Sequence, residues 1–223
     1  MTETADMLRS IPIFAELDDA DLADLAGRCR QMTFKRNSVL MTEGEPGESL
    51  ILIKSGSAKV FVSDEDGHEL VLYVEGPGSY IGDIALLDDA PRSASVVTLE
   101  KTIVLSMAKQ DFLQAMKGNP EIPLSIIRTL TRRLRRATDG IRSLALDNVY
   151  RRLADKLVEL AEDTDEDQFS CLPRRYSHQE LGNMIGASRE MVGKIMAELI
   201  KGEYVEITEA KRIRILKTLP RDW

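Results

Sequence analysis

Between residues 32 and 107, short apolar runs alternate with turn residues along the chain. Five runs rich in β-branched and aliphatic residues lie there, at 49–53, 58–62, 70–74, 94–97 and 102–105. The pair Asp66-Gly67 separates two of them, and Asp-Gly between apolar runs is a strong hairpin signal. Short strands spaced by turns are typical of a β-sandwich, a barrel or a jelly roll. We therefore expect an all-β core, preceded by short helices over residues 8–30.

Residues 109–146 return to a helical pattern that carries a heptad repeat. Its apolar positions follow one another at steps of 3, 4, 3, 4 and 3 residues, and they are Ile127, Leu130, Leu134, Ala137, Ile141 and Leu144. This spacing fits either a helix packed on its own domain or one strand of a parallel coiled coil. Because the repeat stays regular over nearly three heptads, we expect residues 127–144 to form a homodimer interface.

A break at Asp147-Asn148 separates this long helix from the C-terminal part of the chain. Asparagine is a good N-cap, so a further helix is expected to begin there, with its apolar face running from Val149 to Leu160. The pattern divides the chain into an N-terminal domain over 1–120, a dimerisation helix over 121–147 and a C-terminal domain over 148–223.

Two less regular stretches complete the C-terminal part. Residues 162–168 are strongly polar and are expected to form an exposed loop. Residues 204–207 and 212–216 alternate apolar and polar side chains around a short turn, which predicts a β-hairpin.

The strongest local signal of the chain lies between the loop and the hairpin. Ser177 and Glu180 have the spacing of a capping box, so a helix is expected to begin there. Gly186 stands where the chain has to turn, and Ser188 can cap a second helix. Two short helices joined by a turn that contains glycine form a helix-turn-helix.

The second of these helices would present Arg189, Glu190 and Lys194 near its N-terminal end, the part that enters a major groove. Arginine can donate two hydrogen bonds to guanine, and glutamate can accept one from cytosine. Side chains at the start of the first helix are placed to contact phosphates. A charged, solvated face is the alternative, but the following hairpin, as a wing, favours DNA binding. The candidate DNA-binding residues are Ser177, His178, Ser188, Arg189, Glu190 and Lys194.

The formal net charge of −7 is unusual for a DNA-binding protein, but the charge is unevenly distributed. Residues 1–120 carry 11 basic and 20 acidic side chains, a net charge of −9. Residues 121–147 carry 6 basic and 3 acidic ones, and residues 148–223 carry 13 and 14. The acidic charge is therefore concentrated away from the helix-turn-helix.

Composition excludes several classes of protein. The chain has two cysteines and two histidines, which argues against a disulfide framework, a structural zinc site or an iron–sulfur cluster. We find no nucleophile–base pair and no phosphate-binding loop of nucleotide hydrolases, so an enzyme is not expected. The N-terminus resembles neither a signal peptide nor a transit peptide, and no run approaches the roughly 20 apolar residues of a membrane span. We expect a soluble, cytoplasmic protein without a resident cofactor.

Residues 80–94 have the composition of an anion-binding segment. Glycine followed by a short helical turn presents free backbone N–H groups, here at Gly82, Asp83 and Ile84. Arg92 would add a charge-assisted pair of hydrogen bonds, and Ser93 would add a hydroxyl group. The carboxylate at position 83 can accept a hydrogen bond from a ribose hydroxyl. The alternative for Arg92 is an exposed ion pair with one of the neighbouring aspartates.

In these motifs and in the order of its parts, nearly the whole chain resembles the cyclic-AMP receptor protein / fumarate-nitrate regulator family. The segment over 188–193, Ser-Arg-Glu-Met-Val-Gly, and the segment over 80–94 carry the resemblance. It implies an α+β fold: an N-terminal β jelly roll of the cyclic-nucleotide-binding type, a long dimerisation helix and a C-terminal winged helix-turn-helix. It also implies a GTGA-type half-site read by Arg189, Glu190 and Lys194, a palindromic operator, and RNA polymerase as a partner.

The resemblance further implies that Arg133 and Thr138 on the dimerisation helix contact an effector. Three positions depart from the pattern of the cyclic-AMP branch. Asp83 replaces glutamate, Ala137 replaces a threonine that contacts the base, and Lys194 replaces arginine. Lysine is a point donor rather than a fork, so reading of the base at Lys194 is expected to be less selective.

The sequence leaves the effector open. A cyclic mononucleotide, cyclic AMP or cyclic GMP, is one possibility, a cyclic dinucleotide or another anion is a second, and the absence of any effector is a third. The oxygen-sensing branch needs a cysteine cluster that this chain lacks, and His68, in an expected hairpin turn, is a poor haem ligand. A nucleotide-binding regulatory subunit of an enzyme or channel, without a DNA role, is the competing function.

Overall fold

The computed structural model describes residues 3–163 and 170–220. The chain divides into two compact units. The first comprises residues 1–62 and 71–135, and the second comprises residues 63–70 and 136–223. The domain limits expected from the sequence, at 120 and 147, stay predictions.

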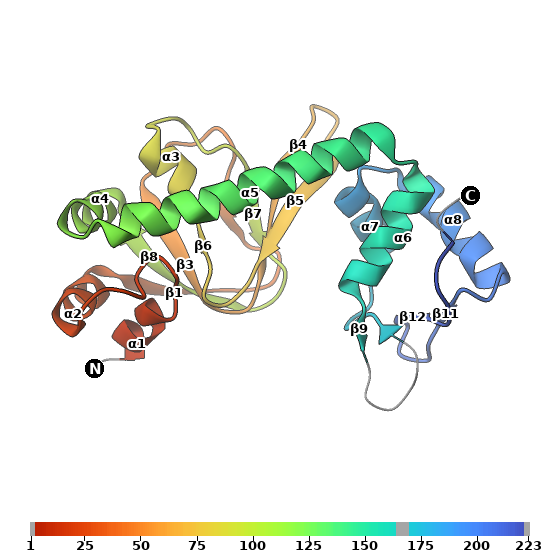
Figure 1. Ribbon diagram of the computed structural model, residues 1–223, viewed down its shortest axis with the longest axis horizontal. Coiled ribbons are helices and arrows are strands. Elements are labelled where there is room, and N and C mark those ends of the chain that lie inside the picture. Colours follow the sequence, from red (N-terminus) through yellow and green to blue (C-terminus); the bar gives the residue numbers. More distant parts are fainter. Residues whose placement is uncertain (1–2, 164–169, 221–223) are drawn as a thin grey trace. The chain divides into compact units, whose positions relative to one another are not determined.

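The first unit is built on a β-sandwich of two antiparallel four-stranded sheets (Figure 1). One sheet has the order β1-β8-β3-β6 and the other β2-β7-β4-β5. The strands are β1 (Arg30–Phe34), β2 (Val39–Met41), β3 (Ser49–Ser55), β4 (Ala58–Ser63), β5 (Glu69–Glu75), β6 (Tyr80–Ile81), β7 (Ser95–Thr98) and β8 (Thr102–Ala108). The predicted sandwich is confirmed, and the five predicted runs correspond to β3, β4, β5, β7 and β8.

Strand β3 explains why its run of apolar residues lacks alternation. Leu50 and Leu52 belong to a core cluster that also contains residues of the flanking helices, whereas Ile51 and Ile53 belong to the cluster inside the sandwich. A strand that is buried on both faces needs apolar side chains at every position. The central strand of this sheet was therefore visible in the sequence as a continuous apolar run.

Helices cover the β1-β8-β3-β6 sheet of the first unit. They are α1 (Glu3–Arg9), α2 (Asp19–Arg28), α4 (Lys109–Gly118) and the first turns of α5 (Glu121–Leu146), while α3 (Asp83–Leu87) follows β6. Phe14 and Phe112 are fully buried among these elements, and Ile122 and Ile126 anchor α5 to the same core cluster. The N-terminal part of α5 therefore belongs to the sandwich.

The heptad positions of α5 are largely exposed. Ile127, Leu134 and Ile141 retain 58%, 68% and 69% of their accessible surface, and Leu144 retains 45%. Leu130 is the exception, because it packs against the core cluster of the first unit. The described part of this chain leaves four large apolar side chains of the repeat in solvent, as an interface with a second copy requires.

The second unit contains three helices among its described residues, α6 (Val149–Leu160), α7 (His178–Ile185) and α8 (Arg189–Lys201). Asn148 caps α6 as predicted, since its side chain accepts a hydrogen bond of 2.8 Å from the backbone N–H of Arg151. Leu153, Leu157 and Leu181 lie in the core that these helices share. The break after α5 is thus a helix cap.

A small antiparallel sheet of order β11-β12-β10-β9 completes the second unit. Its strands are β9 (Glu162–Asp163), β10 (Ser170–Cys171), β11 (Val205–Ile207) and β12 (Ile213–Ile215). The predicted hairpin is confirmed as β11 and β12. The loop expected over 162–168 was wrong at its start, because Glu162–Asp163 pairs with β10. Residues 164–168 of that loop lie outside the described residues.

No helix among the described residues has both the length and the apolar character needed to span a bilayer.

Candidate functional site

The first helix of the predicted pair begins at a capping box. The Ser177 hydroxyl accepts a hydrogen bond of 3.1 Å from the backbone N–H of Glu180, and Glu180 accepts one of 2.7 Å from that of Ser177. Arg174 adds a further hydrogen bond of 2.9 Å to the Glu180 carboxylate. Partial burial would raise the pKa of Glu180, but these donated hydrogen bonds hold it below its usual value.

The turn between the two helices depends on two glycines. Gly186 has φ 63° and ψ 50°, a left-handed conformation that side chains other than glycine rarely adopt. At Gly182 a Cβ atom would lie 2.5 Å from the carbonyl oxygen of Ala187, so a side chain there would displace the turn. Sequence reasoning identified Gly186 but missed Gly182, whose role depends on a backbone contact across the turn.

Helix α8 presents charged side chains at its N-terminal end. Ser188 caps it, and Arg189, Glu190 and Lys194 are all exposed. Neither Arg189 nor Lys194 forms an ion pair with any residue that the structure describes. The pKa of Glu190 lies below its usual value because its own backbone N–H and the Ser188 hydroxyl donate to the carboxylate. These groups are free for external partners.

His178 is exposed at the first position of α7 and lies against α8. A Cβ atom at Gly193 would come within 3.3 Å of the His178 ring nitrogen Nδ1. The glycine therefore lets the start of α7 approach α8 closely. This brings Ser177 and His178 together with the candidate residues of α8, as the sequence predicts.

The hairpin that follows α8 has the form of a wing. Val205 pairs with Ile215 and Ile207 pairs with Ile213. An ion pair of 2.8 Å joins Arg214 to Glu206 across the two strands. The exposed turn contains Lys211 with φ 57°, so a basic side chain stands at its tip.

The predicted anion-binding segment folds around Arg92. Gly82 caps α3 in a left-handed conformation with φ 88°, and a Cβ atom there would lie 2.6 Å from the Met41 methyl group. The Arg92 guanidinium is 93% buried and donates to the carbonyl oxygens of Gly82 and Ser49, each at 2.7 Å. Burial lowers the pKa of Arg92, and neighbouring carboxylates, Asp83 first, oppose this. The alternative, an exposed ion pair of Arg92, was wrong.

Asp83 is held by a residue of α5. It is 99% buried, and Arg133 donates to its two carboxylate oxygens at 2.9 and 3.0 Å. Arg133 also donates to the carbonyl oxygen of Tyr80 at 2.9 Å and to Glu75 at 3.3 Å. Burial opposes the charged form of Arg133, but the Asp83 carboxylate outweighs it and raises the pKa. A carboxylate that the sequence assigned to a ribose is engaged by the chain itself.

Arg133 lies over two aromatic rings. Its guanidinium carbon is 5.3 Å from the ring centres of both Tyr73 and Tyr80. Such cation–π contacts add to the ion pair in fixing the side chain. Sequence reasoning missed Glu75 and the two tyrosines, although the alternating pattern of 70–74 does place Tyr73 on the inward face.

The candidate ligand residues Gly82, Asp83, Ile84, Arg92 and Ser93 line one cavity. Its volume is about 30 Å³, whereas pockets for small ligands typically measure about 300–1,000 Å³. A nucleotide would therefore have to displace side chains in order to enter.

Arg133 joins the cavity through Asp83. Thr138 is exposed on α5 and belongs to the other compact unit. Its predicted contact with an effector stays a prediction.

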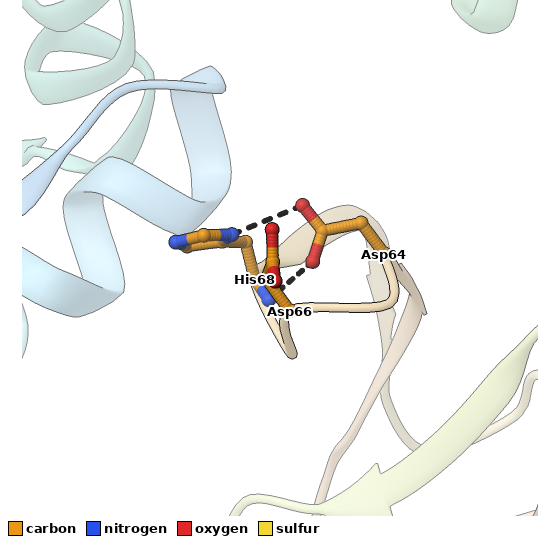
Figure 2. Close-up of side chains that lie close together, drawn as sticks. All are labelled: Asp64, Asp66 and His68. Carbon is orange, nitrogen blue, oxygen red and sulfur yellow. Dashed lines mark hydrogen bonds and ion pairs between the residues drawn. The ribbon is translucent and has the colours of Figure 1, made fainter.

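Three potential metal ligands meet at the tip of the β4–β5 hairpin, Asp64, Asp66 and His68 (Figure 2). All three are exposed. The backbone N–H of His68 donates to Asp64 at 2.8 Å, and the His68 ring nitrogen Nδ1 lies 3.0 Å from the same carboxylate. These bonds close the turn around Gly67, which has φ 80°. The cluster is accounted for as a hairpin turn.

Comparison with known proteins matches both parts of the chain to family models. Residues 31–119 match the cyclic nucleotide-binding domain, and residues 151–218 match the Crp-like helix-turn-helix domain.

Curated relatives match over most of their length. The chain is 30% identical over 183 residues, 81% of this chain and 87% of the relative, to the cAMP-activated global transcriptional regulator CRP of Salmonella typhimurium. It is 29% identical over 217 residues, 93% and 97% of the two chains, to the CRP-like cAMP-activated global transcriptional regulator of Mycobacterium tuberculosis.

A solved structure of the c-di-GMP-responsive global regulator CLP of Xanthomonas campestris has the same fold. Its TM-score is 0.80 with 22% identity, and the match covers 90% of this chain and 100% of that one.

Proposed function

The chain belongs to the cyclic-AMP receptor protein / fumarate-nitrate regulator family, and we propose that it is a homodimeric, cyclic-AMP-responsive regulator of transcription. Its cyclic nucleotide-binding domain and its Crp-like helix-turn-helix are those of a ligand-responsive DNA-binding regulator. The single observation that carries the proposal is the exposed, unpaired N-terminal end of α8, with Arg189, Glu190 and Lys194. A regulatory subunit without a DNA role would not need that surface.

Specific binding would be divided between two sets of residues. Arg189, Glu190 and Lys194 would contact base edges, while Ser177, His178 and the cap Ser188 would lie at phosphates. Two copies joined through α5 would bind a palindrome with half-sites about 34 Å apart. Selection of bound duplexes from a random pool tests this. A two-fold symmetric consensus is expected, and a consensus without symmetry would contradict the dimeric arrangement.

The exposed heptad residues support the dimer. A charge at position 141 would face its symmetry partner in a parallel coiled coil, where like charges repel in an apolar environment. Sedimentation of Ile141→Asp is expected to give monomers at concentrations where wild type is dimeric. Arg142→Asp, a neighbouring exposed position off the heptad repeat, is the matched control and is expected to stay dimeric.

The cavity around Arg92 supports an anionic effector. Its guanidinium donates to two backbone carbonyl oxygens, and a cyclic phosphate is a stronger acceptor than either. Calorimetric titration with cyclic AMP, cyclic GMP and cyclic di-GMP identifies the ligand. Arg92→Ala is expected to abolish binding, whereas exposed Arg36→Ala is expected to preserve it. Equal binding by both variants would contradict the assignment.

A cyclic dinucleotide is the second candidate. The observation that favours it is the engagement of Asp83 by Arg133, which leaves that carboxylate no free oxygen for a ribose hydroxyl. Ala137 also offers no hydrogen bond to an adenine base. Tighter binding of cyclic di-GMP than of cyclic AMP in the same titration would select this alternative.

An effector would act through the link between the cavity and α5. Asp83 lines the cavity, and Arg133 is a residue of the dimer helix, so a ligand that competes for Asp83 would alter the contacts of α5. Gating requires different ligand affinities in the two arrangements of the dimer. By likeness to the family, we further propose a cytoplasmic location and RNA polymerase as a partner.

A further inference from the structure

A cleft of about 200 Å³ lies between helices α2 and α4 of the first unit. It is separate from the cavity around Arg92 and shares no lining residue with it. Leu17, Leu25 and Ala115 supply apolar surface, and the carboxylates of Asp21 and Asp24 stand among the polar lining residues. The proposed functions of the chain do not use this cleft.

The cleft already holds one guanidinium group of the chain. Arg28 lies at its edge and forms ion pairs of 2.9 Å with Asp24 and 3.0 Å with Asp111. It also donates to the side-chain oxygen of Gln114 at 3.2 Å. These contacts raise the pKa of Arg28, the hydrogen bond to Asp111 most strongly. The lining groups are therefore arranged to bind a planar cation.

One cation does not balance the three carboxylates of the cleft. The Asp21 carboxylate forms no ion pair with any residue in the described part of the chain. Its neighbourhood is acidic as well, because residues 1–120 carry a net charge of −9. The local charge therefore favours a second positive group beside Asp21.

An apolar surface beside free carboxylates complements the side chain of arginine or lysine. Such side chains lay their aliphatic stems on apolar residues and keep their charged ends at polar groups. A volume of 200 Å³ is small for a whole drug-sized molecule but is enough for a side chain. Leu17 and Leu25 would contact the stem, and Asp21 would bind the charged end.

We propose that the cleft between α2 and α4 is a docking pocket for a basic side chain of a partner protein. The partner would present an arginine or lysine on its surface and would contact the sensor unit without competing for the cavity around Arg92. The proposal is independent of which effector the protein binds and of whether it binds one.

Methyl-detected nuclear magnetic resonance of the full-length protein provides the test. The probe is a capped pentapeptide with arginine between glycines, and its control carries citrulline, which has nearly the same shape without the charge. We expect saturable shifts of the Leu17, Leu25 and Ala115 methyl signals with the arginine peptide only. Equal shifts with both peptides would overturn the proposal, because charge would then not be recognised.

Two variants of the cleft are expected to change the affinity in opposite directions. Asp21→Asn removes the unpaired carboxylate and should weaken binding about two- to fivefold, the range of an exposed ion pair. Arg28→Gln removes the competing cation and should strengthen it. Asp19→Asn, on the same helix outside the cleft, is the matched control and should leave affinity unchanged.

Further outcomes keep the proposal falsifiable. Unchanged affinity in Asp21→Asn would overturn it, and so would binding of free putrescine to the same methyl groups as tightly as the peptide. The second result would mean a small-amine site. Arg28 joins α2 to α4, so the fold of Arg28→Gln is checked by thermal unfolding, and the Asp21→Asn result stands without it. DNA binding by Asp21→Asn separates failure here from failure of the proposed regulator function.

Discussion

The charged groups around Asp83 and those at the start of α8 differ in how they are satisfied. Asp83 is 99% buried, and Arg133 binds both of its oxygens. Arg189 and Lys194 are exposed and have no ion-pair partner among the described residues. A buried charge costs several kcal/mol unless it is paired, whereas a solvated charge costs little. The first region has its charges fixed by the fold, and the second keeps them for a partner.

The largest expected effect comes from breaking the buried pair. Asp83→Asn leaves Arg133 with Glu75 as its remaining carboxylate and should lower the free energy of unfolding by about 3 kcal/mol. Chemical denaturation measures this. Glu190→Gln, which also removes one carboxylate but at an exposed site, is the control and should change stability by less than about 0.5 kcal/mol. Equal losses in the two variants would remove the contrast between the regions.

The converse change affects binding rather than stability. Arg189→Ala should weaken specific DNA binding by about 1–3 kcal/mol, because a bidentate contact to guanine would be lost. Its unfolding should match that of wild type. Gel-shift titration measures the affinity, with Lys201→Ala at the far end of α8 as the control. If Lys201→Ala lost as much affinity as Arg189→Ala, the N-terminal end of α8 would not be the reading surface.

A finer test concerns the point donor at position 194. Lys194→Arg supplies a planar fork, so discrimination between the preferred base and its competitors should rise by about 1 kcal/mol. The measurement compares the affinities of wild type and variant for operators that differ in one base pair. Unchanged discrimination, with phosphate-type salt dependence only, would place residue 194 at the DNA backbone.

The smallest effect is a pH dependence at the capping box of α7. The folded pKa of Glu180 lies below its usual value of 4.5, so its contribution is fully present above pH 4.5 and is lost as the pH falls through the folded pKa. The stability advantage of wild type over Glu180→Gln should be present at pH 7 and shrink at acid pH. An advantage that grew on acidification would reverse the sign of the pKa shift.

Local patterns of residues are enough to predict much of the fold. The capping box of Ser177 and Glu180, the cap at Asn148 and the five apolar runs of the sandwich rest on residues a few positions apart. Strands β1 and β2 escaped prediction because their side chains are mostly exposed or half-buried, without a clean apolar pattern. Strand β9 escaped because its sequence, Glu162–Asp163, is polar and depends on pairing with β10.

The two candidate sites divide along the same line. The sequence alone determined the order of sandwich, long helix and winged helix-turn-helix, and it placed Arg189, Glu190 and Lys194 on an outer helix face, because helical periodicity fixes such a face. Only the tertiary structure decided that Asp83 binds Arg133, 50 residues away, that Arg92 is buried against backbone carbonyls, and that α2 and α4 enclose a cleft. Contacts of that range follow from how strands and helices pack, which no local pattern of residues encodes.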